Sequence, residues 1–167
     1  MISDPDQNHI KKALKKLDFL LVQDIFLTET AEFADVVLPA ASFAEKDGTF
    51  TNTERRIQRI NKAIDPIGDS KADWQILMEI STLLGYEEYY ADPSEIMDEI
   101  AACTPSYGGI SYKRLKKESL QWPCTNKDHP GTKYLHKNTM ARGKGLFVPI
   151  DYEESKELPD EKYPLIL

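Results

Sequence analysis

Cysteine is scarce in this sequence: only Cys103 and Cys124 occur among 167 residues, and neither belongs to a CxxC pair. Two thiolates are too few for a four-iron cluster or a four-thiolate zinc site. A chain of this length buries enough surface to fold without disulfides or a structural metal. The sequence also lacks an apolar run of roughly 18 residues, so we expect no membrane span.

Other absences narrow the classes of function. Lys and Arg number 21 against 28 Asp and Glu, and the net charge of −7 argues against nucleic-acid binding. Neither a GxGxxG nor a Walker-type phosphate loop occurs, and the three histidines show no metal-ligand spacing. A lone thiol at Cys124, without an identified base, is weak evidence for a nucleophile. We therefore predict no catalytic and no metal-ligating residue in this chain.

The start of the chain bears on its location. Asp4 and Asp6 lie close to Met1, whereas a signal peptide begins with basic residues. We therefore expect a cytoplasmic protein. The last residues, 163–167, read as the opening of a buried strand, so we expect the chain to be an internal part of a longer one.

The first half of the sequence alternates helical and strand patterns, which is typical of an α/β unit. A helical pattern over residues 7–17 precedes two apolar runs, at 19–22 and 35–39. We interpret these runs as strands buried on both faces and joined by a parallel crossover. Gln23 and Asp24 follow the first run, at the carboxyl edge of the sheet, where open α/β folds bind nucleotides. From position alone, a binding role and a plain loop turn stay equally open for them.

Further elements are expected along the chain. A helix begins at Asp73 and ends at Gly85, and its apolar stripe predicts core packing. The stripe comprises Trp74, Leu77, Ile80, Leu83 and Leu84. Other helices are expected over 40–47, from 92 and over 111–118, and a strand over 49–52. The basic residues of 111–118 read as a solvated face: Lys113, Arg114, Lys116 and Lys117.

Four segments carry a resemblance to a known family. They read VQDIFLTETA at 22–31, FADVVLP at 33–39, EKDGTFTNTERR at 45–56 and KADWQI at 71–76. Their order and spacing resemble the molybdopterin oxidoreductase family. Within that family, QWPC at 121–124 and HPGT at 129–132 resemble the catalytic subunit of molybdenum or tungsten formate dehydrogenases.

The resemblance implies a doubly wound, parallel-sheet α/β domain, present in part over residues 1–85. A helical and irregular extension over residues 86–167 would lead toward a missing C-terminal domain. The implied cofactor is bis(molybdopterin guanine dinucleotide) with molybdenum or tungsten, and this chain would hold only part of its site. The parent enzyme would oxidise formate to carbon dioxide. Its electrons would pass through iron–sulfur clusters, which this chain lacks, to electron-transfer subunits.

By the same resemblance, the cofactor-binding residues are Gln23, Asp24, Thr28, Lys46 and Asp73. A carboxylate at Asp24 or Asp73 can accept two parallel hydrogen bonds from guanine, whose donor pair adenine lacks. The Lys46 ammonium suits a pyrophosphate, and Thr28 lies where hydroxyls and backbone N–H groups meet anions. Asp73 has a rival role as a helix cap. We interpret residues 54–56 as a structural ion-pair cluster.

The resemblance also sets expectations for the chain by itself. It is expected to be inactive, to contact the remaining domains of the parent subunit, and to self-associate through apolar surface that those domains would cover. Two alternatives stay open. The chain could serve another molybdopterin oxidoreductase, such as a nitrate reductase or a quinone oxidoreductase subunit. It could also be a scaffold or interaction domain that keeps the fold without the cofactor.

Overall fold

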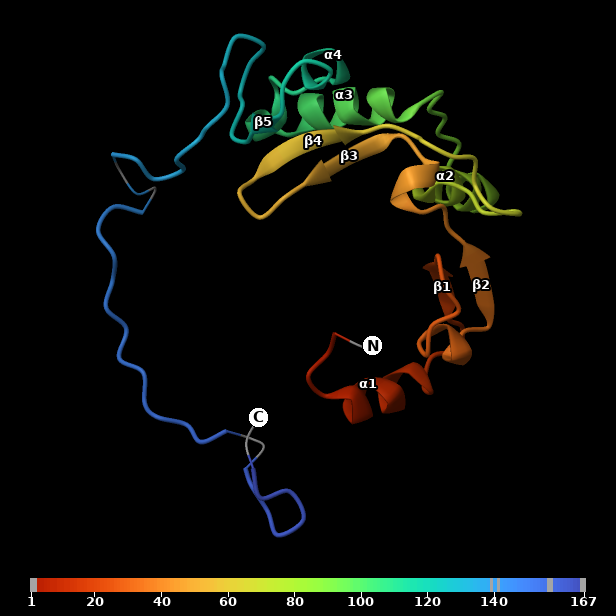
Figure 1. The fold of residues 1–167 in the computed structure, drawn as a ribbon, viewed down its shortest axis with the longest axis vertical. Helices are drawn as coiled ribbons and strands as arrows, with labels where there is room; N and C mark the ends of the chain where they lie inside the picture. Colours follow the sequence, from red (N-terminus) through yellow and green to blue (C-terminus); the bar gives the residue numbers. More distant parts are fainter. Residues whose placement is uncertain (1–2, 139, 141, 156–157, 166–167) are drawn as a thin grey trace. The chain divides into compact units, whose positions relative to one another are not determined.

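The computed structural model describes residues 3–138, 140, 142–155 and 158–165. The chain divides into two compact units, Met1–Lys133 and Tyr134–Leu167. The helices and strands that the structure describes all lie in the first unit (Figure 1). Residues 163–165 are not in a strand, contrary to expectation, and 166–167 lie outside the described residues. Within the described ranges, no helix is long and apolar enough to cross a membrane.

Helices and strands are interspersed along the chain, and the strands form one parallel and one antiparallel sheet. In chain order they are α1 (Gln7–Leu14), β1 (Leu21–Asp24), η1 (Ala31–Phe33), β2 (Val36–Pro39), η2 (Phe43–Glu45), β3 (Gly48–Thr51), β4 (Arg56–Ile60), α2 (Asp73–Leu83), α3 (Pro93–Cys103), η3 (Pro105–Tyr107), α4 (Tyr112–Leu115) and β5 (Leu120–Gln121). The three η elements are short 3-10 turns. The predicted α/β class is confirmed.

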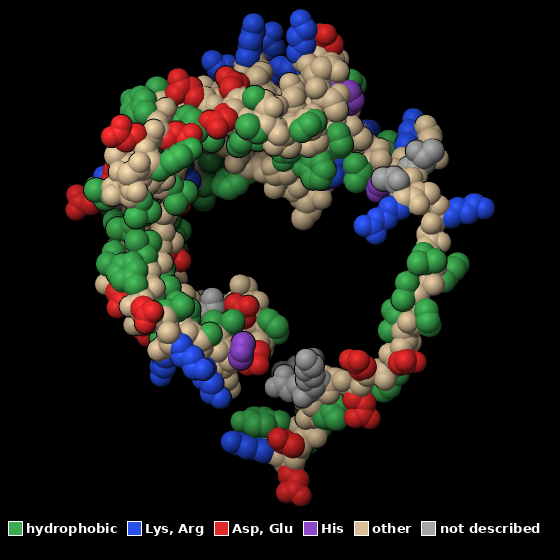
Figure 2. All heavy atoms as spheres, turned by 180° about the vertical axis from the view of Figure 1, so that it is seen from behind, with side chains coloured by type: hydrophobic (Ala, Val, Ile, Leu, Met, Phe, Trp, Pro, Cys, Tyr) green, Lys and Arg blue, Asp and Glu red, His purple; other side chains and the backbone are tan. Residues whose placement is uncertain are grey.

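Strands β1 and β2 form a parallel pair, as predicted, and their carboxyl ends meet where Asp24 lies opposite Pro39. The prediction that they are buried on both faces is wrong: Leu21, Val36 and Val37 are 36–38% exposed. Parallel sheets are normally covered by helices on both faces. Among the described residues this sheet has only two strands, and Figure 2 shows hydrophobic side chains on the surface over them.

Strands β3, β4 and β5 form an antiparallel sheet in that order. The β3–β4 hairpin is closed by Asn52, whose Oδ1 accepts hydrogen bonds from Glu54 N at 3.1 Å and Arg56 N at 3.0 Å. Arg55, in the turn, has a φ of 65°, a left-handed conformation unusual for a residue with a side chain. Arg56 Nη2 lies 3.2 Å from Glu54 Oε2, so the ion-pair cluster predicted over residues 54–56 contains this pair, whereas Arg55 donates to a backbone carbonyl.

The hydrophobic core lies between the β4–β5 pair and helices α3 and α4 (Figure 1). Its buried members are Ile57, Met97, Ile110, Tyr112, Leu115, Leu120 and Cys124. Helix α3 begins as predicted, because Asp92 Oδ1 accepts a hydrogen bond from Ser94 N at 2.7 Å. Cys124 has no exposed surface, so its thiol belongs to this core.

Helix α2 forms where it was predicted, but its apolar stripe does not pack in a core. Leu77, Leu83 and Leu84 are exposed, and Ile76 is the buried residue of the helix. Trp74 and Ile80, the other two members of the predicted stripe, are half-buried. The described residues therefore cover the predicted stripe only in part.

Two arginines donate to backbone carbonyls of the loop before α4 and of the segment that follows β5. Arg114 Nη1 donates to Gly109 O at 2.8 Å and its Nη2 to His129 O at 2.9 Å. Arg55 Nη2 donates to Thr132 O at 3.0 Å. The prediction of a solvated face is therefore wrong for Arg114, because its guanidinium satisfies carbonyls inside the unit. The expected domain boundary near residue 85 stays a prediction.

Candidate functional site

Backbone pairing brings the start of α2 to the carboxyl edge of the parallel sheet. Ala40, directly after β2, forms a parallel bridge with Lys71, and Ala41 N donates to Lys71 O at 2.7 Å. Asp73 follows two residues later as the first residue of α2. Gln23 is the next-to-last residue of β1, so the side chains of Gln23 and Asp73 meet at the same edge of the sheet.

The carboxylate of Asp73 is the centre of a hydrogen-bonded cluster. Its Oδ1 accepts a hydrogen bond from Gln23 Nε2 at 2.6 Å, and its Oδ2 pairs with Lys46 Nζ. The side chains of Lys46 and Asp73 are 21% and 46% exposed, so the ion pair lies at the surface with one open side. The cap residue of α2 is Ala72, so the rival role of Asp73 as the helix cap is not what the structure shows.

Opposing effects act on the ionisation of Asp73. Partial burial raises the pKa of its carboxyl, but the hydrogen bonds from Lys46 and Gln23 and the positive charge of Lys46 outweigh it. The net result is a pKa below the ordinary value of 3.8. The ion pair therefore stabilises the fold above that ordinary value, and this contribution is lost as the pH falls through the lowered pKa. At neutral pH the cluster presents an anion and a cation side by side.

A cavity of about 290 Å³ opens beside Lys46 and Asp73. Its walls include the aromatic rings of Phe50, Trp74 and Tyr112. Planar aromatic walls next to a charged pair suit a ligand that has both a ring and a charged group. One sequence signal pointed to this cavity, the position of Trp74 directly after Asp73, but the apolar periodicity of the helix favoured a core role for Trp74.

A larger hollow lies elsewhere and has different chemistry. It occupies about 700 Å³ at the end of α2 and the following loop. Its lining contains the carboxylates Glu79, Glu87 and Glu88 and no lysine or arginine. Three carboxylates would repel an anionic ligand. The smaller cavity is therefore the better candidate for a phosphate-bearing ligand.

Asp24 and Thr28 take part in the turn after β1. Asp24 Oδ1 accepts a hydrogen bond from Phe26 N at 3.1 Å, and Thr28 Oγ1 accepts one from Ala31 N at 3.4 Å. Both contacts are local turn bonds of the kind that Asp and Thr side chains favour. The described hydrogen bonds thus join Gln23, Lys46 and Asp73 in one cluster and give the other two predicted residues a role in the adjoining loop.

Metal ligands do not gather at this site. In the ranges that the structure describes, no group of three or more His, Cys, Asp or Glu side chains could hold a metal ion. The donor set instead suits an organic anion. Lys46 can bind a phosphate as a point charge, and Asp73 can accept hydrogen bonds from a base.

Comparison with known proteins adds sequence and fold relatives. Residues 1–83 match the model of the molybdopterin oxidoreductase family. The whole chain is 54% identical to the F420-dependent formate dehydrogenase subunit alpha of Methanocaldococcus jannaschii and spans 25% of its length. Over 98% of the chain, identity is 52% to a putative formate dehydrogenase of Staphylococcus haemolyticus, 17% of which is covered. The chain thus spans about a quarter or less of the length of these relatives.

A solved structure supports the fold. Acetylene hydratase from Pelobacter acetylenicus superposes with a TM-score of 0.54 at 23% identity. The match covers 70% of this chain and 16% of that protein. At this identity the likeness concerns the fold.

Proposed function

Because this chain belongs to the molybdopterin oxidoreductase family, we propose that it is part of a formate dehydrogenase alpha subunit and binds the guanine dinucleotide end of the cofactor. The observation that carries this proposal is the cluster of Gln23, Asp73 and Lys46 at the carboxyl edge of β1 and β2. Open α/β sheets bind nucleotides at this edge, because the loops there present polar groups around a crevice.

Lys46 and Asp73 together supply the groups that a guanine nucleotide needs. An ammonium has three N–H donors, so Lys46 can bind Asp73 and still donate to phosphate oxygens. An ionised carboxylate has about four acceptor positions, of which Gln23 and Lys46 occupy two. The remaining positions can accept the ring N–H and the exocyclic amine of guanine. Adenine lacks this pair of donors, so the arrangement favours guanine.

The surrounding residues support the same ligand. We propose that Asp24 and Thr28 shape the turn that borders the nucleotide, since their side chains hold its backbone. Phe50 and Trp74 line the adjoining cavity and offer apolar contact to a planar base. The donor set therefore fits the tail of a molybdopterin guanine dinucleotide.

The cofactor, when bound, supplies two-electron redox chemistry at molybdenum or tungsten. In the longer protein we propose oxidation of formate to carbon dioxide, with electrons leaving through iron–sulfur clusters to other subunits. The chain's own residues bind and orient the nucleotide end, and we propose that the chain alone does not turn over formate. The relative from Methanocaldococcus jannaschii is named an alpha subunit, which supports the presence of partner subunits.

Exposed hydrophobic side chains and free cysteines support two further parts of the proposal, contact with other domains and a cytoplasmic location. Hydrophobic side chains exposed over β1 and β2 are the surface that we expect the remaining domains to cover, and a route to self-association without them. Cys103 and Cys124 are both free thiols, which suits the reducing cytoplasm.

Titration of the ¹⁵N-labelled chain with GDP tests the nucleotide site. We expect millimolar GDP to shift the amide resonances of Gln23, Lys46 and Asp73, and ADP at the same concentration to shift them less. Lys46→Met should weaken GDP binding about tenfold or more, because a charge-assisted hydrogen bond contributes about 1.5–3 kcal/mol. The measurement is the dissociation constant from the shift changes.

Lys62→Met is the matched control for this titration. Lys62 pairs with the exposed Asp65, at 2.6 Å between Nζ and Oδ1, and does not line the cavity. Its removal should leave the GDP affinity unchanged. Equal losses from the Lys46 and Lys62 variants, or equal binding of GDP and ADP, would contradict the proposal.

A further inference from the structure

Glu45 is a buried carboxylate that the proposed function does not use. Its residue is only 6% exposed, although it lies next to Lys46 in the chain. Its Oε2 accepts a hydrogen bond from Ser42 N at 2.7 Å, and its own N–H donates to Ser42 O at 3.1 Å. These two bonds both join Ser42 to Glu45 and close the turn η2. A carboxylate is costly to bury, so its presence here calls for a physical reason.

The turn that Glu45 closes is tied to the rest of the site. Ala44 O accepts hydrogen bonds from Ala63 N at 2.8 Å and Ile64 N at 3.1 Å. Just before the turn, Ala41 N donates to Lys71 O, two residues before Asp73. The turn therefore has one anchor on the segment after β4 and another on the segment that leads into α2.

Lys46 leaves this turn with an extended backbone, at φ −143° and ψ 154°. Its long side chain has many rotamers, and holding it in one place costs entropy. When the backbone of Lys46 is already fixed, only the rotamers of its side chain have to be restricted for the ammonium to reach Asp73. The closed turn fixes the backbone of Lys46 in this way.

We propose that Glu45 is a positioning residue: its hydrogen bond to Ser42 N fixes the turn so that the Lys46 ammonium reaches Asp73. Resting on the proposed function, the same bond would fix the ammonium for the phosphate of the nucleotide. The role belongs to the acceptor geometry of the Glu45 side chain rather than to its charge. Glutamine, whose amide oxygen is also an acceptor, should therefore replace it, and alanine should not.

The pH titration of Asp73 by carboxyl ¹³C NMR tests this inference without any nucleotide. In Glu45→Ala, Lys46 should no longer be held against Asp73, and the pKa of Asp73 should rise toward its ordinary value of 3.8. In Glu45→Gln, the lowered pKa should be kept. A purely structural effect on global stability would not change the pKa of Asp73 in the folded molecules.

Two outcomes would overturn the inference. An Asp73 pKa that is unchanged in Glu45→Ala shows that Lys46 needs no positioning. Equal rises in Glu45→Ala and Glu45→Gln show that an acceptor at this position is not what holds Lys46 against Asp73. Should Glu45→Ala not fold, Ser42→Pro removes the donor instead, because Ser42 has a φ of −71° that proline adopts; the Asp73 pKa should rise there too, and an unchanged value overturns the inference.

GDP binding and the Asp73 pKa test the proposed function and the positioning role of Glu45 independently. If GDP does not bind the unchanged chain while the Asp73 pKa responds to Glu45→Ala, the nucleotide site is wrong and the positioning role stands. If GDP binds, Glu45→Ala should weaken it about tenfold, as loss of one charge-assisted contact predicts, and Glu45→Gln should restore it. Unweakened GDP binding to Glu45→Ala would contradict the inference.

Discussion

Gly109→Ala is expected to destabilise the first unit by about 3 kcal/mol or more. A Cβ at this position would lie 2.0 Å from Asn126 O and 2.9 Å from Cys124 Sγ. The nearest atom belongs to the backbone, so no side-chain rotation relieves the clash. The surroundings are also fixed, because Gly109 N donates to Cys124 O at 2.7 Å. Overpacking of a tight site typically costs about 1–3 kcal/mol, and a contact with rigid backbone lies at or beyond the upper end.

The effect is measured as the free energy of unfolding in urea, with Gly48→Ala as the matched control. At Gly48 a Cβ would lie 3.7 Å from the Ile60 side chain, an ordinary contact, and the residue is in the same unit. We expect this control to change the unfolding free energy by less than about 1 kcal/mol. Similar values for the two variants would contradict the close packing of residues 108–126.

Asp73→Ala in the longer protein is expected to speed the loss of the guanine-containing cofactor about 100-fold. The substitution removes the acceptor that we propose for guanine and leaves Lys46 without its partner carboxylate. Charge-assisted hydrogen bonds contribute about 1.5–3 kcal/mol each, and each 1.4 kcal/mol corresponds to a factor of ten. The measurement is the guanine that remains per protein chain during dialysis, followed over time.

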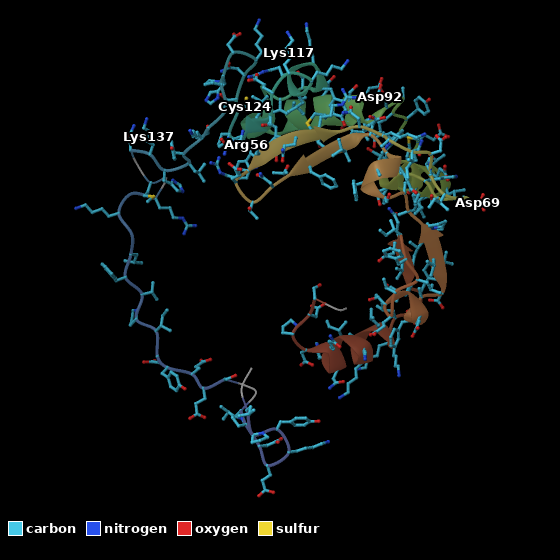
Figure 3. The ribbon with its side chains drawn as sticks, viewed as in Figure 1. Arg56, Asp69, Asp92, Lys117, Cys124 and Lys137 are labelled. Carbon is cyan, nitrogen blue, oxygen red and sulfur yellow. The ribbon has the colours of Figure 1, made fainter. Side chains whose placement is uncertain are left out.

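Asp69→Ala is the control for this experiment. Asp69 is an exposed carboxylate on the loop before α2, and Figure 3 shows its side chain pointing away from the protein. Its removal changes the net charge by the same amount as the Asp73 variant but leaves the cluster intact. Equal rates of cofactor loss from the two variants would show that Asp73 has no specific role.

Local sequence signals predicted the frame of the site. The apolar runs before Gln23 and before Pro39 predicted a parallel pair, and the structure confirms it. The start of α2 at Asp73 and of α3 after Asp92 followed from residues that favour helix N-termini. Such signals depend on neighbours within a few residues, so one sequence is enough to detect them.

Long-range contacts could not be predicted from composition or periodicity. Lys46 meets Asp73 across 27 positions, and only the family resemblance named both. Arg55 lies in a charge-dense segment without a clear period, yet its side chain donates to backbone carbonyls on Trp122 and Thr132. Burial was misjudged for part of an apolar stripe, as for Leu77 in α2, whose side chain is exposed.

We propose that Asp73, held by Gln23 and Lys46, binds guanine. The most direct measurement is an experimental structure of the longer protein with its cofactor bound. We predict that the ring N–H and the exocyclic amine of guanine donate to the Asp73 carboxylate, with N···O distances of about 2.7–3.2 Å. A guanine seated elsewhere, with the Asp73 carboxylate bound only to Gln23 and Lys46, would contradict the account.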